Sequence, residues 1–329
     1  MTTLLSLKWI VLTILIFLVF WGILFSILLT RNTSQIGENL TITPIPSISE
    51  NQPVVETLVM IPTPVIGENQ PIGENLTITP IQSIYITLPI QEFYSCDRDS
   101  GYISNNYEIY NNFWGKDRSG ETYAQCIWVN SPEDPFSVSA GWNWWPGPKG
   151  DGGVKAYPTI IYGWAPWLPT STDAPLPVQL SKMGSYLASF DVSVIASKDS
   201  IYNTAFDIWI TSAAQPTPEN RTKEVMIWVN HQNMPQNFTK ATNSQRVTID
   251  GDEYDYGYWD KQGTHDYIKF VKVVPQITGS IFVDHFLIFL MEEGYISVDE
   301  YLADIEFGNE IVFGTGHTII RSYSVTPSD

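Results

Sequence analysis

The chain has 329 residues and is strongly acidic, with 35 Asp and Glu against 17 Lys and Arg, for a formal net charge of −18. This charge excludes nucleic acid as a natural partner, because binding a polyanion requires Lys and Arg that displace its counterions. Charged residues make up 16% of the chain and aromatic residues 13%, and this composition favours a strand-rich, often secreted class of protein.

Residues 1–30 are predicted to form a transmembrane signal anchor. The stretch from Trp9 to Leu29 carries no charge and lies between Lys8 and Arg31. A helix of that length spans roughly 30 Å, the thickness of the hydrocarbon core of a bilayer. A cleaved signal peptide is the alternative, although no Ala-x-Ala pattern follows the apolar run. Both interpretations place the rest of the chain outside the cytoplasm, either anchored to the membrane or secreted.

Residues 31–91 are predicted to form a disordered linker. The ten-residue string that begins at Ile36 recurs unchanged from Ile72, and prolines recur throughout the segment. A repeat must bury an apolar face against its neighbours to build a solenoid, and this segment is poor in large residues. A semi-extended stalk is therefore favoured over a small packed module.

Residues 92–329 are predicted to form one folded domain, which contains both cysteines. In an extracytoplasmic domain, Cys96 and Cys126 indicate one disulfide rather than a metal or redox site, with two free thiols as the alternative. The four histidines show no zinc spacing and are expected in surface or structural roles, so no metal is expected. They are His231, His265, His285 and His317.

Alternation of side-chain types predicts strands in this domain. In 223–229 and 204–211, one set of alternate residues is apolar and is expected to face a core: Val225, Ile227, Val229, Phe206, Ile208 and Ile210. The opposite set is unusual for a solvent face and suits the floor of a groove: Glu224, Met226, Trp228, Asp207, Trp209 and Thr211.

Further strands are predicted at 185–196 and 305–312, and one helix at 281–293, where an apolar segment is closed by Gly294. Many short strands with one helix predict an all-β fold, a two-sheet antiparallel β-jelly-roll sandwich.

Two carboxylates are candidates for catalysis. Glu224 belongs to the groove-facing set, and Glu310 shares a face with Glu306 and Gly308. Glycoside hydrolysis requires two carboxyl groups across the scissile bond, and aromatic rings such as those of Trp bind sugars through their faces. Alternation alone leaves open that both Glu residues are simply solvated side chains on strands.

Three runs resemble the signature segments of glycoside hydrolase family 12: Asn-Asn-Phe-Trp-Gly at 111–115, Glu-Val-Met-Ile-Trp at 224–228 and Phe-Gly-Asn-Glu at 307–310. The resemblance spans about Cys96 to Ser324, with the motifs in the family's order. It implies a β-jelly-roll endo-β-1,4-glucanase that retains configuration at the anomeric carbon. Cys96 and Cys126 are placed like the disulfide of fungal members.

By position, the resemblance implies that Glu224 is the nucleophile, Glu310 the general acid/base and Asp207 a third carboxyl close to the nucleophile. It implies a sugar-binding cleft lined by Asn112, Trp114, Met226 and Trp228. Trp142, Trp144 and Trp209 match less closely and are expected as additional platforms. The family commonly has Thr where this chain has Asn309, and we expect altered tuning rather than lost activity.

The expected function is therefore hydrolysis of internal bonds of β-1,4-linked glucans by a monomeric enzyme with a two-carboxylate double displacement, which needs no cofactor. One alternative is a non-catalytic glycan-binding module on the same jelly roll. Another is a xyloglucan-active hydrolase or transglycosylase that uses the same site.

Overall fold

The computed structural model describes residues 91–115, 123–130, 138–145 and 153–328. The predicted anchor at 1–30 and the predicted linker up to residue 90 lie outside these ranges. Among the described residues, none of the helices has the length and apolar character needed to cross a membrane.

The smaller of two stacked sheets has the strand order β1-β4-β5-β18-β8-β14 within the described ranges. Its strands are β1 (Gln91–Ser95), β4 (Ala124–Asn130), β5 (Val138–Trp145), β18 (Gly316–Ser328), β8 (Ser185–Ala196) and β14 (Thr278–Phe282). All of these pairings are antiparallel. The predicted strand at 185–196 is confirmed as β8.

The larger sheet follows the order β11-β12-β13-β10-β9-β16-β6-β3-β2. Its main strands are β2 (Gly101–Ser104), β3 (Tyr107–Tyr110), β6 (Thr159–Gly163), β9 (Ile201–Thr211), β10 (Arg221–Gln232), β11 (Asn243–Ile249), β12 (Asp252–Gln262), β13 (His265–Lys272) and β16 (Asp304–Gly308). Short strands β7 (Val178–Gln179), β15 (Tyr301–Leu302) and β17 (Ile311–Phe313) attach to it. The predicted strand at 305–312 is thus divided between β16 and β17, and Glu310 lies in the break.

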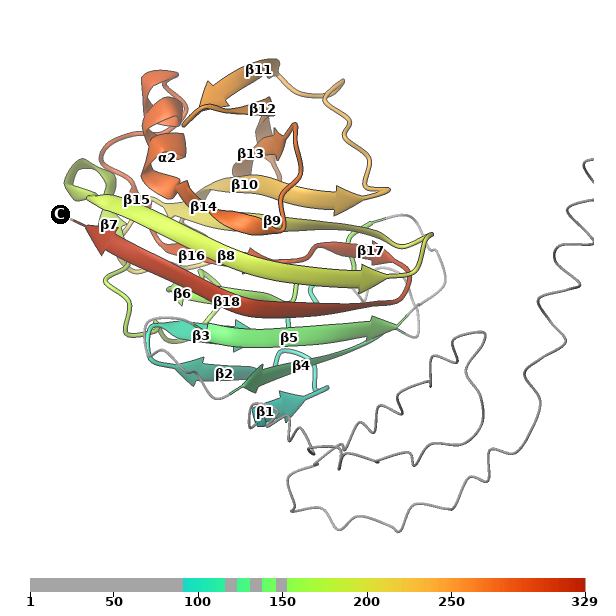
Figure 1. Cartoon of the computed structure of the whole chain (residues 1–329). Coiled ribbons are helices and arrows are strands. Elements are labelled where there is room, and N and C mark those ends of the chain that lie inside the picture. Colours follow the sequence, from blue (N-terminus) through green and yellow to red (C-terminus); the bar gives the residue numbers. More distant parts are fainter. Residues whose placement is uncertain (1–90, 116–122, 131–137, 146–152, 329) are drawn as a thin grey trace, which may run out of the picture. The chain divides into compact units, whose positions relative to one another are not determined.

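One pairing differs from the antiparallel prediction, because β10 and β13 run parallel. The segment 233–242 carries the chain back before β11 begins, so β11 and β13 run in the direction of β10 while β12 opposes them. The two-sheet jelly-roll sandwich itself is confirmed, and in Figure 1 the smaller sheet, with β8, β18 and β5, lies in front of the larger sheet.

The hydrophobic core lies between the sheets. The apolar sets predicted to face inward from β9 and β10 are all in this core, including Phe206 and Ile227, which are fully buried. Burial of a large apolar side chain contributes about 2 kcal/mol, so the inward set fixes which face of each strand remains for function.

Trp142 and Trp144 also lie in this core, so their interpretation as sugar platforms is wrong. Both are completely buried, because the alternation of β5 turns them inward and leaves Trp145 as the exposed indole. Gly316 in β18 makes room for Trp144, since a Cβ at that position would lie 1.9 Å from the indole ring.

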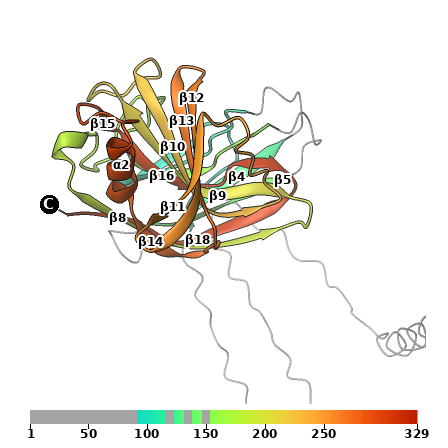
Figure 2. The same ribbon diagram turned by 90° about the horizontal axis from the view of Figure 1, so that it is seen from above.

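Helix α2 (Val283–Glu292) begins two residues later than predicted, because the preceding residues form β14. The helix is capped by Glu293, and the next residue, Gly294, has a φ of +76°, a conformation that favours glycine. Phe286 packs its ring edge-on to Tyr254 of β12 and Phe270 of β13, both at 5.1 Å. The helix therefore covers the core side of β12 and β13, and it lies next to the first residues of β8 (Figure 2).

Cys96 and Cys126 form a disulfide in the structure. Cys96 directly follows β1 and Cys126 lies in β4, so the bond joins two neighbouring strands of the smaller sheet.

Candidate active site

The candidate site lies on the outer face of the larger sheet, which we define as the face turned away from the sandwich core. Cross-strand register places polar residues side by side there: Met226 of β10 opposite Asp207 of β9, and Asp207 opposite Glu306 of β16. The same row continues to Lys269 on one side and, through Ile161, to Glu108 on the other. Strands far apart in sequence thus bring four ionisable residues into one line.

Glu224 lies in β10, one position along the same face from Met226 and opposite Trp209 of β9. Its Oε2 lies 2.9 Å from Nε2 of His265, and its side chain keeps 21% of its surface exposed. The carboxylate expected to act as nucleophile is therefore accessible and is held by a neighbouring imidazole.

Glu310 is held between β16 and β17 by Asn203 of β9. The Asn203 side-chain amide donates to Oε2 of Glu310, and the Glu310 backbone N–H donates to Oδ1 of Asn203. The pKa of Glu310 is raised to about 7, mainly by burial and then by the charge of Glu224, against the opposing effects of Asn203 and Lys269. A carboxyl group with this pKa retains its proton near neutrality and can act as an acid.

Asp207 lies near the same two carboxyl groups and is 6% exposed. Burial raises its pKa well above the ordinary value, and the charge of Glu224 adds to this effect, followed by those of Glu306, Asp304 and Glu310. Asp207 is therefore expected to carry a proton at neutral pH.

Asp304, Glu306 and Glu108 extend this acidic row beyond the residues singled out in the sequence. Asp304 and Glu306 are fully buried, and Glu108 is 8% exposed. Burial is the main cause of a raised pKa in all three, and it brings the pKa of Glu108 to about 7. For Glu306, one sequence signal could have indicated this position, because alternation places it on the same face as Glu310.

Met226 and Trp228 lie on the outer face but are almost completely covered. The Tyr267 hydroxyl donates to the Met226 sulfur at 3.3 Å, and the Lys269 ammonium lies 4.5 Å from the centre of a Trp228 ring. Both residues thus support the floor of the site rather than present an open surface.

Trp209 lies beside Glu224 but offers no open platform. The guanidinium of Arg221 lies 5.1 Å over its ring, and the rings of Trp167 and His265 contact it edge-on at 5.3 and 4.9 Å. Only 5% of the surface of Trp209 is exposed, so its ring packs beside Glu224 instead of offering a free face to a sugar.

Asn112 and Trp114 follow β3. Asn112 is nearly buried, and its Oδ1 accepts a hydrogen bond from the backbone N–H of Trp114 at 3.1 Å. Trp114 is 45% exposed, which makes it the most accessible of the tryptophans expected to bind sugar. Asn112 therefore shapes the turn that presents the Trp114 ring.

Three residues in direct or electrostatic contact with the catalytic candidates were not predicted. His265 contacts Glu224, Asn203 holds Glu310, and Lys269 acts on Glu310 through its charge. Alternation along β13 places His265, Tyr267 and Lys269 on one face, but nothing in the sequence indicates that β13 lies next to β10.

Several buried polar atoms on this face have no hydrogen-bond partner among the described protein atoms. They include Oδ1 of Asp207, Oδ2 of Asp304 and the indole nitrogens of Trp209 and Trp228. Because buried polar groups are normally paired, such a group of unpaired donors and acceptors indicates a site built for function rather than for stability.

An all-β sandwich that exposes two electrostatically coupled carboxyl groups beside aromatic rings defines the class of jelly-roll glycoside hydrolases. Residues 105–327 match the sequence model of the family described as Glycosyl hydrolase family 12. The chain therefore belongs to glycosyl hydrolase family 12, as the sequence motifs predicted, and it is a glycoside hydrolase.

Individual relatives are similar over the same part of the chain. Endoglucanase S of Pectobacterium parmentieri is 31% identical over 239 residues, which cover 70% of this chain and 86% of that protein. A probable xyloglucan-specific endo-beta-1,4-glucanase A of Aspergillus terreus is 26% identical over 234 residues, covering 70% and 86%. The family 12 xyloglucanase of Bacillus licheniformis, solved with a ligand, superimposes with a TM-score of 0.62 at 26% identity, covering 72% of this chain and all of that one.

Proposed function

We propose that this protein is a retaining endo-β-1,4-glucanase that hydrolyses internal bonds of β-glucans with Glu224 and Glu310. The observation that carries the proposal is the coupling of these two carboxyl groups on one face, where the charge of Glu224 helps to raise the pKa of Glu310 to about 7. Such a pair supplies one ionised and one protonated carboxyl group at the same pH, as double displacement requires.

In the first step, the Glu224 carboxylate attacks the anomeric carbon and forms a glycosyl ester. The bond from the anomeric carbon to the glycosidic oxygen breaks, and Glu310 gives its proton to that oxygen, so that one part of the glucan leaves with a free hydroxyl. Asn203 fixes the Glu310 carboxyl through two hydrogen bonds and so aims the proton.

In the second step, Glu310 is ionised and accepts a proton from water while the water oxygen attacks the anomeric carbon. The ester bond breaks, Glu224 leaves as a carboxylate, and the second inversion restores the original configuration. Asp207 stays protonated beside Glu224 and can donate a hydrogen bond to it as charge returns to that carboxylate.

The substrate class follows from the relatives and from the accessible surface. The Pectobacterium relative is named an endoglucanase and the Aspergillus relative a probable xyloglucan-specific endo-beta-1,4-glucanase, so cleavage within a glucan is the feature shared by their names, and the Aspergillus name gives a β-1,4 linkage. The exposed ring of Trp114 suits stacking against a neutral sugar. Activity on xyloglucan, by hydrolysis or by transglycosylation from the same ester, is the second candidate and is favoured by the names of the Aspergillus and Bacillus relatives.

We also propose that the catalytic domain works outside the cytoplasm, held at the membrane by residues 1–30 through the linker, or secreted after cleavage. The disulfide between Cys96 and Cys126 supports this location, because such bonds persist in oxidising compartments. Protease added to intact cells should remove the domain from anchored protein, while recovery of the domain only from lysed cells would contradict the proposal.

The proposal is tested with Glu224→Gln, Glu310→Gln and the exposed control Glu219→Gln on soluble β-glucan. We expect the first to lose about a thousandfold or more in kcat and the control to keep wild-type turnover. Glu310→Gln should lose about a hundredfold to ten-thousandfold on polymer. It should lose far less on an aryl cellobioside whose leaving group needs no proton.

Two results would contradict the proposal. Wild-type turnover by Glu224→Gln would remove the nucleophile, and release of the α-anomer as first product, followed by NMR, would exclude retention. A purely glycan-binding module would bind glucan without releasing reducing ends, and wild type would then be inactive.

A further inference from the structure

His265 makes direct contact with the carboxylate proposed as nucleophile. Nε2 of His265 lies 2.9 Å from Oε2 of Glu224, and only 13% of the histidine side chain is exposed. A hydrogen bond to a charged group at this distance and degree of burial is stronger than one between neutral groups. The contact engages one of the two carboxylate oxygens.

The imidazole is oriented from two further sides. Its Nδ1 lies 3.4 Å from the hydroxyl oxygen of Thr264, and the ring of Trp209 meets it edge-on at 4.9 Å and 73°. With Nδ1 accepting from the hydroxyl, Nε2 carries the proton that is donated to Glu224. The contact is therefore set by the position of β13 rather than by a freely rotating side chain.

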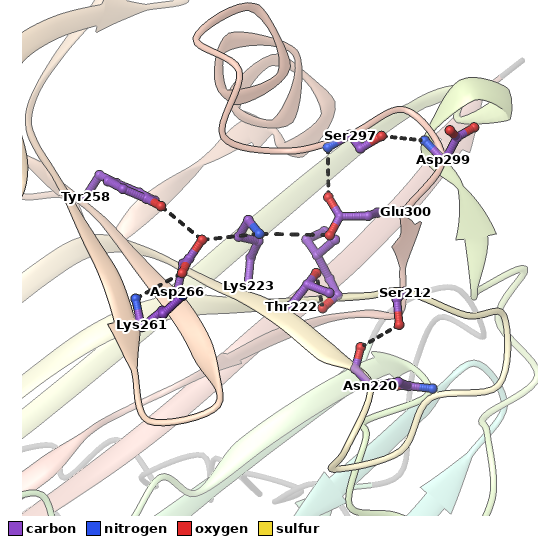
Figure 3. A network of polar contacts seen from close by, with 11 residues as sticks. Ser212, Asn220, Thr222, Lys223, Tyr258, Lys261, Asp266, Ser297, Asp299 and Glu300 are labelled. Atoms are coloured by element: carbon purple, nitrogen blue, oxygen red, sulfur yellow. Dashed lines mark hydrogen bonds and ion pairs between the residues drawn. The ribbon is translucent and has the colours of Figure 1, made fainter.

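The opposite side of the hairpin between β12 and β13 is anchored by Asp266 (Figure 3). Its two carboxylate oxygens accept hydrogen bonds of 3.0 Å from the Tyr258 hydroxyl and from the backbone N–H of Lys261. Lys223 lies 3.3 Å from the same carboxylate. Burial tends to raise the pKa of Asp266, but these hydrogen bonds and the charge of Lys223 outweigh it and lower the pKa.

This anchor joins the two strands that carry the His265–Glu224 contact. Lys223 of β10 is paired in register with Asp266 of β13. Lys223 directly precedes Glu224 in the chain, and Asp266 directly follows His265. Lys223 also lies 3.9 Å from Glu300, which accepts a hydrogen bond from the backbone N–H of Ser297 (Figure 3). β10 and β13 are thus tied on both faces at the level of the nucleophile.

We propose that His265 is a positioning residue that holds the Glu224 carboxylate oriented for attack, a role that rests on the proposed function. The ionisable groups around the contact are Asp207, Glu306 and Glu310, which interact electrostatically with Glu224, together with Arg221 over a ring of Trp209 and the Lys223–Asp266 pair on the opposite face. Because the donor engages one oxygen of the Glu224 carboxylate, its removal frees the carboxylate to leave the orientation that attack requires.

The test measures formation of the glycosyl ester directly. Wild type, His265→Ala and His265→Gln are incubated with dinitrophenyl 2-deoxy-2-fluoro-β-cellobioside, whose leaving group needs no acid, and labelled protein is followed by mass. We expect His265→Ala to label about tenfold to a hundredfold more slowly, because the carboxylate loses the donor that orients it. His265→Gln retains a donor and should recover part of the rate, with little change in the concentration for half-maximal labelling.

His285→Ala is the matched control. His285 lies at the start of α2, outside the acidic row, and it also contacts a carboxylate, that of Asp250. This variant should label like wild type, and unfolding midpoints of all variants show that each is folded. Labelling of His265→Ala within about twofold of wild type overturns the inference and leaves the proposed function standing. Failure of wild type to label at Glu224 overturns the proposed function and this role with it.

Discussion

At the residue scale, Asn309 shows what the departure from the family's usual Thr does. Its side-chain amide donates to the backbone carbonyl of Asn203 at 2.7 Å and to the Thr204 hydroxyl at 2.9 Å, and its Oδ1 accepts from the Trp142 indole and the Thr318 hydroxyl. This fully buried amide thus joins β9, β5 and β18 directly before Glu310. A threonine could satisfy only part of this set.

We expect Asn309→Ala to lower the free energy of unfolding by about 3 kcal/mol, because it leaves the buried Trp142 indole and Thr318 hydroxyl without their acceptor. The same change should lower kcat, since the residue before Glu310 loses its side-chain hydrogen bonds to Asn203 and Thr204 of β9. Urea unfolding of this variant measures the first effect. The exposed control Asn237→Ala should cost less than about 1 kcal/mol, and an equal cost for both variants would contradict the assignment.

Glu310 predicts the alkaline limit of activity. The pKa of Glu310 is raised to about 7, mainly by burial, and the first step of the proposed double displacement needs the proton of this carboxyl group. As pH rises through that value the proton is lost, so kcat/KM on polymer should fall above about pH 7. The profile for a substrate with an activated leaving group should lack this limb. A polymer profile that stays flat to about pH 9 would exclude Glu310 as the acid.

At the element scale, alternation predicted β9 and β10 correctly and failed on β5. At 206–210 in β9 and at 225–229 in β10, one set of alternate residues is purely apolar, so the core face could be chosen from the sequence. In β5 both faces carry tryptophan, and only the three-dimensional fit of Trp144 against Gly316 distinguishes them. The partners of Glu224 and Glu310 on β13 could not be predicted either, because the parallel pairing with β10 depends on a crossover that has no local signal.

β13 also supplies Lys269, whose ammonium lies 4.5 to 5.3 Å from rings of Trp228, Phe238 and Trp259. Burial lowers its pKa to about 8, so it is still charged at neutral pH, and this charge lowers the pKa of Glu310. We expect Lys269→Met to raise the pKa of Glu310 and move the alkaline limb upward by up to about one pH unit.

Lys269→Arg should keep the limb near its wild-type position, because the guanidinium remains charged and stacks on aromatic rings. The exposed control Lys240→Met should leave the profile unchanged. The kcat/KM profile on polymer measures the shift. An unmoved limb in Lys269→Met, in a variant that unfolds like wild type, would show that Lys269 only packs against the rings.

At the scale of the whole described domain, the fold class could be predicted because the strands, the single helix and the motifs all agree. The buried acids could not be predicted, since alternation shows which residues share a face but not what covers it. The outer face near β3 and β6 is covered by a small apolar cluster of Tyr110, Ile161, Ala165, Trp167 and Leu168. Ile161 is paired in register with both Glu108 and Glu306, so these two carboxyl groups lie beside that cluster. Carboxyl groups that the sequence presents as ordinary surface charges are therefore buried.

This burial makes the stability of the domain depend on pH. Burial raises the folded-state pKa of Glu108 from 4.5 to about 7, and it raises those of Asp207, Asp304 and Glu306 in the same direction. A carboxyl group whose pKa is raised by folding binds more protons in the folded state. Its stabilising contribution is complete below the unfolded pKa and disappears as pH rises through the folded pKa.

We therefore expect the free energy of unfolding to be highest near about pH 4 to 5 and to fall continuously to about pH 8. Glu108 alone should account for about 3 kcal/mol of that fall. Urea unfolding at a series of pH values measures the slope, and Glu108→Gln should flatten it because the amide does not ionise. Glu219→Gln removes one exposed negative charge and should leave the slope nearly unchanged, which separates burial from general charge repulsion. Equal slopes in wild type and Glu108→Gln would show that Glu108 is solvated rather than buried.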